Sequence, residues 1–327
     1  MSDLGACVAD EARARRAAHP GGARAGVDVG SNSVRLLVAD AEGAPITRLM
    51  RITRLGAGVD ETGHLDDAAL ERTLEALREF HGVWREHGAD GRVRIAATSA
   101  VRDASDRERF FDGVREITGA EAEVLSGDEE AALAHAGATG AVEIEEPAVV
   151  LDVGGGSTEL VVGDPDGGVA GSVSLQLGCV RLTERLLPSD PPAPEQLAAA
   201  RDEIIARLDE ADARLAGQGI SLRQARSVVG VAGTSTTLGA LHLGLQAYDP
   251  SRIHGTRVPA VAVRDLVVQL VGLPAVQRAE LGPVQPGRED VLHGGALIVA
   301  AVLDRYEFDE LVVSESDSLD GLVASLA

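Results

Sequence analysis

The sequence contains one pattern twice, and this internal repeat constrains the fold more than any other feature. The two copies are VDVGSNSVRLLVAD (27–40) and LDVGGGSTELVVGD (151–164). At an offset of 124 residues, seven of the thirteen positions in 28–40 are identical to their counterparts in 152–164. In both copies, apolar and often β-branched residues surround a glycine-containing bend, which predicts a strand, a turn and a second strand. We therefore expect two similar halves, each built on one such hairpin.

Helices and strands alternate between and after the hairpins. Asp66 is a suitable N-cap for a helix whose apolar residues recur at helical spacing, namely Leu70, Leu74, Leu77, Phe80 and Trp84. Further strands are predicted at 92–99, 120–127, 226–233 and 311–316. Helices are predicted from about Asp106 and over 129–138, 178–187, 195–216, 234–246 and 289–306, followed by a final helix. Such an order favours mixed α/β sheets covered by helices.

This pattern predicts two α/β domains after a frayed N-terminal extension. The extension covers residues 1–25, the first domain 26–140 and the second domain 141–327. The final helix is a candidate to pack back on the first domain. We expect the two domains to face each other across a cleft, so that each presents a glycine turn to it.

Composition agrees with a two-domain globular protein and excludes several classes. Of 327 residues, 45% are hydrophobic but only 2% are aromatic, so Val, Leu and Ala must fill the interior. The net charge is −22 and every basic residue is arginine. A general nucleic-acid binder would carry a basic face, and no apolar run reaches the roughly 20 residues of a membrane helix. With only Cys7 and Cys179 we expect no disulfide framework, which indicates the cytoplasm.

The glycine turns are candidate phosphate sites, because successive N–H groups in such turns bind anions. An Asp precedes each turn, and its charge fits beside a phosphate if a hard cation, Mg²⁺ or Mn²⁺, lies between them. Asp152 is the first candidate ligand and Asp28 the second. A third turn, VVGVAGTSTT (228–237), adds to the pattern, although one of its residues, Thr234, could equally be a helix cap. The predicted phosphate contacts on the turns are Gly30, Ser31, Asn32, Ser33, Gly154, Gly155, Gly156, Ser157, Gly233 and Thr234.

Six segments in order along the chain resemble a known family. They are DVGSNSVRLLV (28–38), ATSAVRDA (97–104), SGDEEA (126–131), LDVGGGSTELVVG (151–163), GCVRLTE (178–184) and GVAGTSTTLGAL (230–241). The chain resembles the actin / sugar kinase / Hsp70 superfamily, with its two similar ribonuclease-H-like domains flanking a cleft. More narrowly, it is similar to the exopolyphosphatase / guanosine pentaphosphate phosphatase (Ppx/GppA) family in its short form.

Three positions depart from the family pattern. Asp106 and Asp128 stand where the family usually or often has Asn, and Asp106 would serve equally well as a helix cap. The end reads SESDSLDGLV (314–323), which leaves one basic residue fewer near the cleft than the common pattern. This departure affects the expected substrate preference and leaves the reaction class unchanged.

The resemblance implies catalytic roles for acids in two of these segments. Glu129 and Glu130 are adjacent and point about 100° apart on a helix, so one of them faces the cleft; the family match favours Glu130 as the base that activates water. The alternative is that both only complement the helix N-terminus. Glu159 would hold the attacking water or the metal's water shell, or would lie on the surface; its counterpart in the first repeat is Arg35.

The remaining candidates are basic residues. Arg102, expected on a loop after a strand, would bind a terminal phosphate bidentately, as the resemblance implies. For Arg181 a helix-packing role is as well supported as binding. His293 is expected on a helix near the cleft or the core. The eight histidines show no metal-ligand spacing, and neither cysteine is placed to be a nucleophile.

These inferences predict a cytoplasmic exopolyphosphatase that releases terminal orthophosphate from inorganic polyphosphate by Mg²⁺-assisted attack of water. A role in the stringent response is expected. The alternatives are hydrolysis of guanosine pentaphosphate and a regulator that binds either ligand without turnover. A sugar or acetate kinase shares the expected fold, but SGDEEA argues against it. No nucleic-acid or membrane partner is expected, and a homodimer is a candidate assembly.

Overall fold

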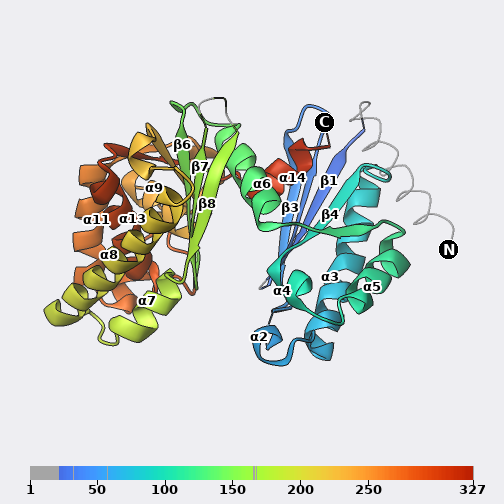
Figure 1. Ribbon diagram of the computed structural model, residues 1–327, viewed down its shortest axis with the longest axis horizontal. Helices are drawn as coiled ribbons and strands as arrows, with labels where there is room; N and C mark the ends of the chain where they lie inside the picture. Colours follow the sequence, from blue (N-terminus) through green and yellow to red (C-terminus); the bar gives the residue numbers. More distant parts are fainter. Residues whose placement is uncertain (1–21, 32, 57, 165, 167, 327) are drawn as a thin grey trace. The chain divides into compact units, whose positions relative to one another are not determined.

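The computed structural model describes residues 22–31, 33–56, 58–164, 166 and 168–326, and it divides into two units (Figure 1). The first unit contains the chain up to Leu133 together with Ser318–Ala327, and the second contains Ala134–Asp317. Most of the predicted N-terminal extension lies outside the described residues. Its last residues, Arg24 and Ala25, already belong to the first strand, which therefore begins two residues earlier than the sequence predicted.

The first unit is built on a five-stranded sheet in the order β3-β2-β1-β4-β5. The strand β1 pairs antiparallel with β2 and parallel with β4. The strands are β1 (Arg24–Val29), β2 (Ser33–Ala39), β3 (Pro45–Ile52), β4 (Val93–Ala97) and β5 (Ala122–Val124). The helices are α2 (Val59–Thr62), α3 (Asp67–Glu86), α4 (Ser99–Asp103), α5 (Glu108–Thr118), the start of α6 (Gly127–Thr139) and α14 (Ser318–Ala324).

The second unit is built on a six-stranded sheet in the order β10-β11-β9-β6-β7-β8. Its strands are β6 (Ala148–Val153), β7 (Thr158–Gly163), β8 (Val169–Leu175), β9 (Ser227–Val231), β10 (Arg257–Pro259) and β11 (Glu310–Val313). Its helices are α7 (Cys179–Leu186), α8 (Pro194–Ala216), α9 (Ala232–His242), α10 (Pro250–Ile253), α11 (Ala260–Gly272), α12 (Ala275–Arg278) and α13 (Leu292–Tyr306), with a 3₁₀ turn at Leu222–Gln224.

The two sheets share one topology. If β6, β7, β8, β9 and β11 are matched to β1 through β5, the strand order and the parallel or antiparallel sense of every pair agree. Even the irregularity in pairing recurs, between Val38 and Ala39 in one sheet and between Val162 and Gly163 in the other. This agreement confirms the predicted duplication and the fold class, two ribonuclease-H-like α/β domains.

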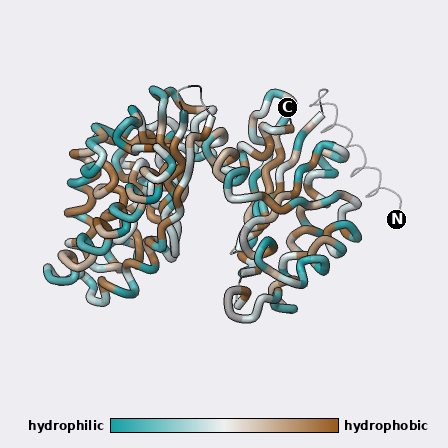
Figure 2. The backbone as a smooth tube through the Cα atoms, viewed as in Figure 1, coloured by the Kyte–Doolittle hydropathy of each residue, from teal (hydrophilic) through white to brown (hydrophobic). Residues whose placement is uncertain are grey.

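Hydrophobic residues, coloured brown along the backbone in Figure 2, are concentrated in the strands and on the helices that cover them in each unit. In the first unit one core lies between the sheet and α3 and α5, and it contains the predicted stripe from Leu70 to Trp84. A second, smaller core lies on the other face, where Leu319, Leu322 and Val323 of α14 pack against the sheet. The last helix of the chain thus belongs to the first unit.

Several predicted elements are confirmed and others were missed. The Asp66 side chain caps α3 by accepting from the Ala69 N–H at 2.9 Å, as expected. Asp106 does not cap the next helix, because α5 begins after Arg107 and the Asp106 carboxylate accepts from the Leu65 N–H instead. The sequence analysis did not predict the third strand of either sheet, β3 and β8, or the helix α11.

His293 lies in the core of the second unit, on α13, as one of its two predicted placements stated. Its side chain is 2% exposed, and within the described part of the chain neither ring nitrogen has a hydrogen-bond partner. Burial, together with the nearby positive charge of Arg278, lowers the pKa of His293 to about 4. The folded protein therefore keeps this ring neutral.

This buried ring predicts loss of stability in acid. Below about pH 6.5 the imidazole binds a proton in the unfolded chain but not in the folded chain. The free energy of unfolding therefore falls between about pH 6.5 and pH 4, by about 3 kcal/mol in total. Replacing the ring in His293→Leu should flatten the dependence of the urea midpoint on pH across this window. Parallel pH profiles for the two proteins would contradict the assignment.

Candidate active site

The second glycine turn, residues 154–157, presents backbone N–H groups to solvent. The Gly154 N–H closes the turn by donating to the Ser157 carbonyl at 3.0 Å. The N–H groups of Gly155, Gly156 and Ser157 donate no hydrogen bond to any described residue. Successive N–H groups of this kind bind anions in other proteins, and the phosphate contacts predicted for this turn stay a prediction.

The helix α7 braces this turn from behind. Its first N–H groups, on Cys179, Val180 and Arg181, donate to the carbonyls of Gly154 and Gly155 at 2.9 to 3.1 Å. The approach is so close that a side-chain carbon on Gly178 would lie 2.4 Å from the Gly155 carbonyl carbon. Because α7 occupies the carbonyls, the orientation of the peptide groups is fixed and their N–H groups remain available.

The first turn, residues 30–33, has the same hydrogen bond but is described in part. The Gly30 N–H donates to the Ser33 carbonyl at 2.9 Å, as in the second turn. The predicted phosphate contact Asn32 lies outside the described residues. The equivalent of the α7 brace is a hydrogen bond from the Gly56 N–H to the Ser31 carbonyl, at 2.8 Å.

The acids that precede the two turns have opposite surroundings. Asp28 pairs across the hairpin with Arg35, whose Nε donates to its Oδ2 at 3.0 Å and whose Nη2 forms an ion pair with it. Asp152 occupies the same position in the second hairpin, but its cross-strand partner is Glu159. The same hairpin geometry thus contains a neutralised acid in one unit and two acids side by side in the other.

This contrast separates the two predicted metal ligands. Like charges on directly paired residues are unfavourable unless a cation lies near them, and Mg²⁺ is commonly held by one or two carboxylates together with water and phosphate oxygens. Asp152 and Glu159 fit that requirement, whereas an arginine already occupies Asp28. No group of three or more His, Cys, Asp or Glu residues arranged for a metal occurs among the described residues. Two carboxylates are enough for the mode of Mg²⁺ binding in which water and phosphate oxygens supply the remaining ligands.

The third turn follows β9 and carries a strained residue. Ala232 adopts a left-handed backbone conformation, with φ of 57°, which is uncommon for a residue with a side chain. Thr234 is 2% exposed and its hydroxyl donates to the Val153 carbonyl at 3.3 Å, so it links this turn to the strand that precedes the second turn. It is not the N-cap of α9, and its predicted phosphate contact stays a prediction.

Arg288 is a candidate binding residue that the sequence analysis missed. Its guanidinium lies against Gly233, where a side-chain carbon would come within 1.9 Å of it. Among the described residues it has neither an ion pair nor a side-chain hydrogen bond, although it is half-buried. No motif marks it, because it lies 55 residues beyond Gly233 in the chain and only the fold brings the two together.

The adjacent acids at the start of α6 have different roles. The Glu129 carboxylate accepts from the N–H and the hydroxyl of Ser126 at 2.9 and 2.8 Å, and the Ser126 hydroxyl accepts from the Glu129 N–H. This capping box holds the pKa of the Glu129 carboxyl below its usual range. Glu129 is thereby occupied at the helix terminus, as the structural alternative predicted for this pair.

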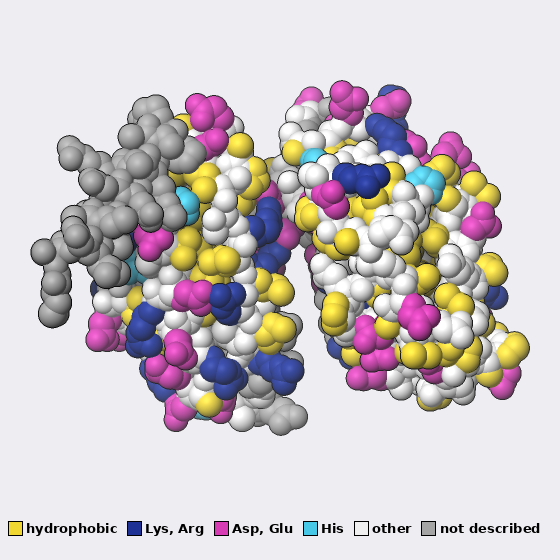
Figure 3. Space-filling model, turned by 180° about the vertical axis from the view of Figure 1, so that it is seen from behind, with side chains coloured by type: hydrophobic (Ala, Val, Ile, Leu, Met, Phe, Trp, Pro, Cys, Tyr) yellow, Lys and Arg dark blue, Asp and Glu magenta, His cyan; other side chains and the backbone are white. Residues whose placement is uncertain are grey.

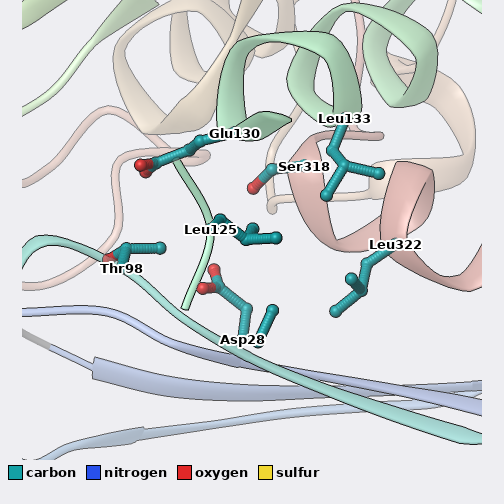
Figure 4. A pocket seen from close by; sticks show the side chains of 8 residues that line it. Asp28, Thr98, Leu125, Glu130, Leu133, Ser318 and Leu322 are labelled. Carbon is teal, nitrogen blue, oxygen red and sulfur yellow. The ribbon is translucent and has the colours of Figure 1, made fainter. Parts of the chain in front are cut away.

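Glu130 instead lines a pocket of the first unit (Figure 4). In Figure 4 the Asp28 carboxylate and the Ser318 hydroxyl lie among the leucines of a mostly apolar lining, and the Glu130 carboxylate and the Thr98 hydroxyl extend to the side away from them. Its accessible volume of about 10 Å³ is close to the room that one water molecule needs. Of the two glutamates, Glu130 is the one placed beside a space of that size.

Arg102 lies next to Glu130, on the short helix α4 and not on a loop as predicted. Its Nη1 donates to the Leu125 carbonyl at 3.0 Å and is 3.9 Å from Glu130 Oε2. The side chain is 36% exposed, so part of the guanidinium remains accessible to a ligand. The predicted base and the predicted phosphate-binding arginine therefore belong to one cluster.

Two further residues near the second turn are structural. Arg181 donates to the Gly156 carbonyl at 2.7 Å and to Gln176, which supports its packing alternative. Burial raises the pKa of the Cys179 thiol, which opposes a nucleophilic role, as expected. The structure thus assembles the predicted residues into two clusters, one in each unit.

The surface charge fits a local anion site better than a general one. On the face seen in Figure 3, arginine and acidic side chains are interspersed over both units, with no continuous basic area among the coloured residues. None of the described helices is both long enough and apolar enough to cross a membrane. This face therefore offers no general basic surface to a polyanion.

Comparison with known proteins finds similarity over almost the entire chain. Residues 37–327 match the model of the Ppx/GppA phosphatase family. The chain is 43% identical over 320 residues to Exopolyphosphatase 2 of Mycobacterium tuberculosis, covering 93% of this chain and 98% of that protein. It is 32% identical over 307 residues to Exopolyphosphatase 1 of the same organism, covering 91% and 86%. The crystal structure of the Aquifex aeolicus Ppx/GppA family member superposes with a TM-score of 0.80 at 30% identity, covering 93% and 96%.

The contact between Gly178 and the second turn predicts a large effect of a single methyl group. Gly178→Ala should destabilise the protein by about 1–3 kcal/mol, because the new carbon meets backbone atoms that cannot rotate away. A matched control is Gly82→Ala on the exposed side of α3, where nothing lies within 4 Å and about 0.5–1 kcal/mol of stabilisation is expected. Urea unfolding measures both; equal effects of the two substitutions would show that the brace is not tight.

Proposed function

Because this chain belongs to the Ppx/GppA phosphatase family and is therefore a hydrolase, we propose that it releases terminal orthophosphate from inorganic polyphosphate, with water as the acceptor. One observation carries the proposal. Of two adjacent glutamates, one is used as a helix cap, whereas Glu130 lines a water-sized pocket beside Arg102. Phosphoryl transfer to water needs a base at such a place, whereas transfer to a substrate hydroxyl does not need a pocket for water. The names of the two mycobacterial relatives point to the same substrate.

Substrate binding is assigned to the turns and to two arginines. The unpaired N–H groups of the second turn would hold phosphate oxygens, as backbone nests do. Arg102 and Arg288 each present an accessible guanidinium, which suits the planar geometry of a phosphate face. These groups suffice for a polyanion even though the protein is strongly acidic overall, because physiological salt largely screens charges that lie more than about 8 Å away.

The pair Asp152 and Glu159 is assigned to a divalent cation, Mg²⁺ or Mn²⁺. When bound, the cation offsets the negative charge of the phosphates. The pair itself keeps two carboxylates together on one face of the hairpin, and Ser174 donates to Glu159 at 2.7 Å, which fixes the orientation of that carboxylate. The residues present thus fit the expected ion.

In the proposed reaction Glu130 accepts a proton from a water molecule as its oxygen attacks the terminal phosphorus. The bond from that phosphorus to the bridging oxygen breaks, and the shortened chain leaves with its terminal oxygen anionic. Arg102 stabilises the charge on the transferred group.

A direct test compares phosphate release from short polyphosphate, long polyphosphate, guanosine pentaphosphate and ATP, each with and without Mg²⁺. The proposal predicts that a polyphosphate has the highest kcat/KM and that release requires the cation. Preference for guanosine pentaphosphate would replace the substrate and keep the reaction. Binding of polyphosphate without any release would instead favour a regulatory protein and contradict the proposal.

The role of Glu130 is tested by a conservative pair of substitutions. Glu130→Gln keeps the shape of the side chain but cannot accept the proton, so kcat should fall by about 10²–10⁴-fold while polyphosphate binding is retained. Glu129→Gln is the matched control, one residue away, and should keep kcat close to that of the wild type. A crippled Glu129→Gln beside an active Glu130→Gln would reverse the assignment.

The carboxylate pair makes a prediction with a readout besides activity. Thermal unfolding of the wild type should shift upward with Mg²⁺, because the cation binds the folded state. In Asp152→Asn/Glu159→Gln the shift should vanish, because both carboxylates assigned to the cation are gone. Phosphate release should fall by about 10²-fold or more.

The control for the carboxylate pair is Asp28→Asn, which alters the equivalent acid of the other unit. Its partner is Arg35, so the substitution breaks an ion pair and should leave the Mg²⁺-dependent shift in place. If Asp28→Asn abolished the shift and the double variant retained it, the cation site would belong to the first unit.

A further inference from the structure

Arg54 has a backbone conformation that the sequence around it does not require. It lies two residues after the end of β3, and its φ is 55°, in the left-handed region. For a residue with a long side chain this conformation is unfavourable. Its side chain is exposed, so burial of apolar surface does not offset that cost.

Both neighbours of Arg54 are held firmly. The Thr53 carbonyl accepts from Nε and Nη2 of Arg72 at 3.1 and 2.9 Å, and Thr53 is 1% exposed. Leu55 is fully buried, and the next residue, Gly56, donates its N–H to the Ser31 carbonyl of the first turn. The chain on each side is thus fixed, and the strained residue between them projects from the surface.

The register of the sheet places Arg54 beside the first turn. Ser33, which ends the turn, pairs with Ile52, and Arg54 lies two residues beyond Ile52 at the same edge of the sheet. At the offset of the internal repeat, Arg54 is the counterpart of Gly178, and Gly56 of Val180. The hydrogen bond from Gly56 to Ser31 matches the one from Val180 to Gly155, so the correspondence holds in the structure.

The two halves therefore differ at one position next to their turns. The second half has Gly178 in an extended conformation, packed against the backbone of the turn. The first half has an arginine in a left-handed conformation. A glycine would occupy that conformation without strain. The backbone conformation therefore does not account for an arginine at this position, and a role of its side chain would.

The charge of Arg54 is also uncompensated. The chain has 52 acidic residues for 30 basic ones, and most arginines of the described residues are paired with an acid. Arg54 has no ion pair and no side-chain hydrogen bond to any described residue. Its neighbours from Leu55 to Gly58 carry no charge. A cation without a protein partner remains available to an anion from solution.

We propose that Arg54 is a substrate-binding residue, which holds a phosphate of the polyphosphate chain other than the one that is transferred. The inference rests on the proposed function. An exposed arginine binds substrate and transition state alike, so its loss should raise KM and leave kcat almost unchanged. Arg54 would thereby favour a chain of several phosphates over a single anionic group.

The test uses three substitutions and one control in the full chain. Arg54→Gln removes the charge, Arg54→Lys keeps it, and Arg54→Gly removes the charge together with the backbone strain. The control is Arg201→Gln, which deletes an exposed and unpaired arginine from α8 of the second unit. KM and kcat for long polyphosphate, the salt dependence of KM and the thermal midpoint are measured for each.

We expect Arg54→Gln and Arg54→Gly to raise KM by about fivefold, the value of one exposed charge contact, with kcat within about twofold of the wild type. Arg54→Lys should recover part of the affinity, and KM should depend less steeply on salt in the two neutral variants. Arg54→Gly should unfold at the same temperature as the wild type or higher. Arg201→Gln should match the wild type throughout.

A wild-type KM in Arg54→Gly would overturn the proposal, and a raised thermal midpoint in the same variant would then assign Arg54 to strain alone. If the wild type releases no phosphate, the proposed function fails separately. Anisotropy of end-labelled polyphosphate still tests Arg54 in that case. Weaker binding by Arg54→Gln than by Arg201→Gln supports the inference; equal binding, or no binding by the wild type, overturns it.

Discussion

The charge opposite the repeated aspartate is the feature on which the rest of the site depends. In each hairpin the glycine turn brings this aspartate into register with the residue seven positions later. An arginine there forms an ion pair with Asp28, whereas a glutamate there pairs across the hairpin with Asp152 and brings a second acid beside it. One duplicated fold thus provides two glycine turns with different electrostatics.

The second constraint is the capping box at the start of α6, which gives the adjacent residues Glu129 and Glu130 different surroundings. The first turn of α6 contains two adjacent glutamates. Ser126, three residues before Glu129, forms a reciprocal cap with that glutamate. Once Glu129 is held, helical geometry turns Glu130 to a different side, where it lines the pocket with Asp28 and Thr98. The cap therefore stabilises the helix and also orients Glu130, the proposed base. Arg102, tied to the Leu125 carbonyl, stands beside this base because α4 follows the neighbouring strand.

Much of this arrangement was predictable, and the exceptions have physical causes. The hairpins, the capped helix α3 and the two-domain duplication follow from period and turn chemistry, which are local. The role of Glu129 was also legible, since Ser126 and Glu129 have the spacing of a capping box, and the pairing of Asp28 with Arg35 follows from counting outward around the turn. The strands β3 and β8 were missed because β3 has an exposed, arginine-rich edge and β8 contains small and polar residues, so neither alternates clearly. Arg288 was missed because its contact with Gly233 joins distant segments, and Arg54 because a backbone angle leaves no mark in sequence.

The central claim is that this duplicated fold transfers a terminal phosphoryl group to water. Hydrolysis of polyphosphate in water enriched in ¹⁸O, followed by mass spectrometry of the products, measures the acceptor directly. The account predicts one ¹⁸O atom in each released orthophosphate and no other small product, with unlabelled orthophosphate unchanged in a parallel incubation. Release of unlabelled orthophosphate, or transfer of the group to an added nucleotide or sugar in preference to water, would contradict it.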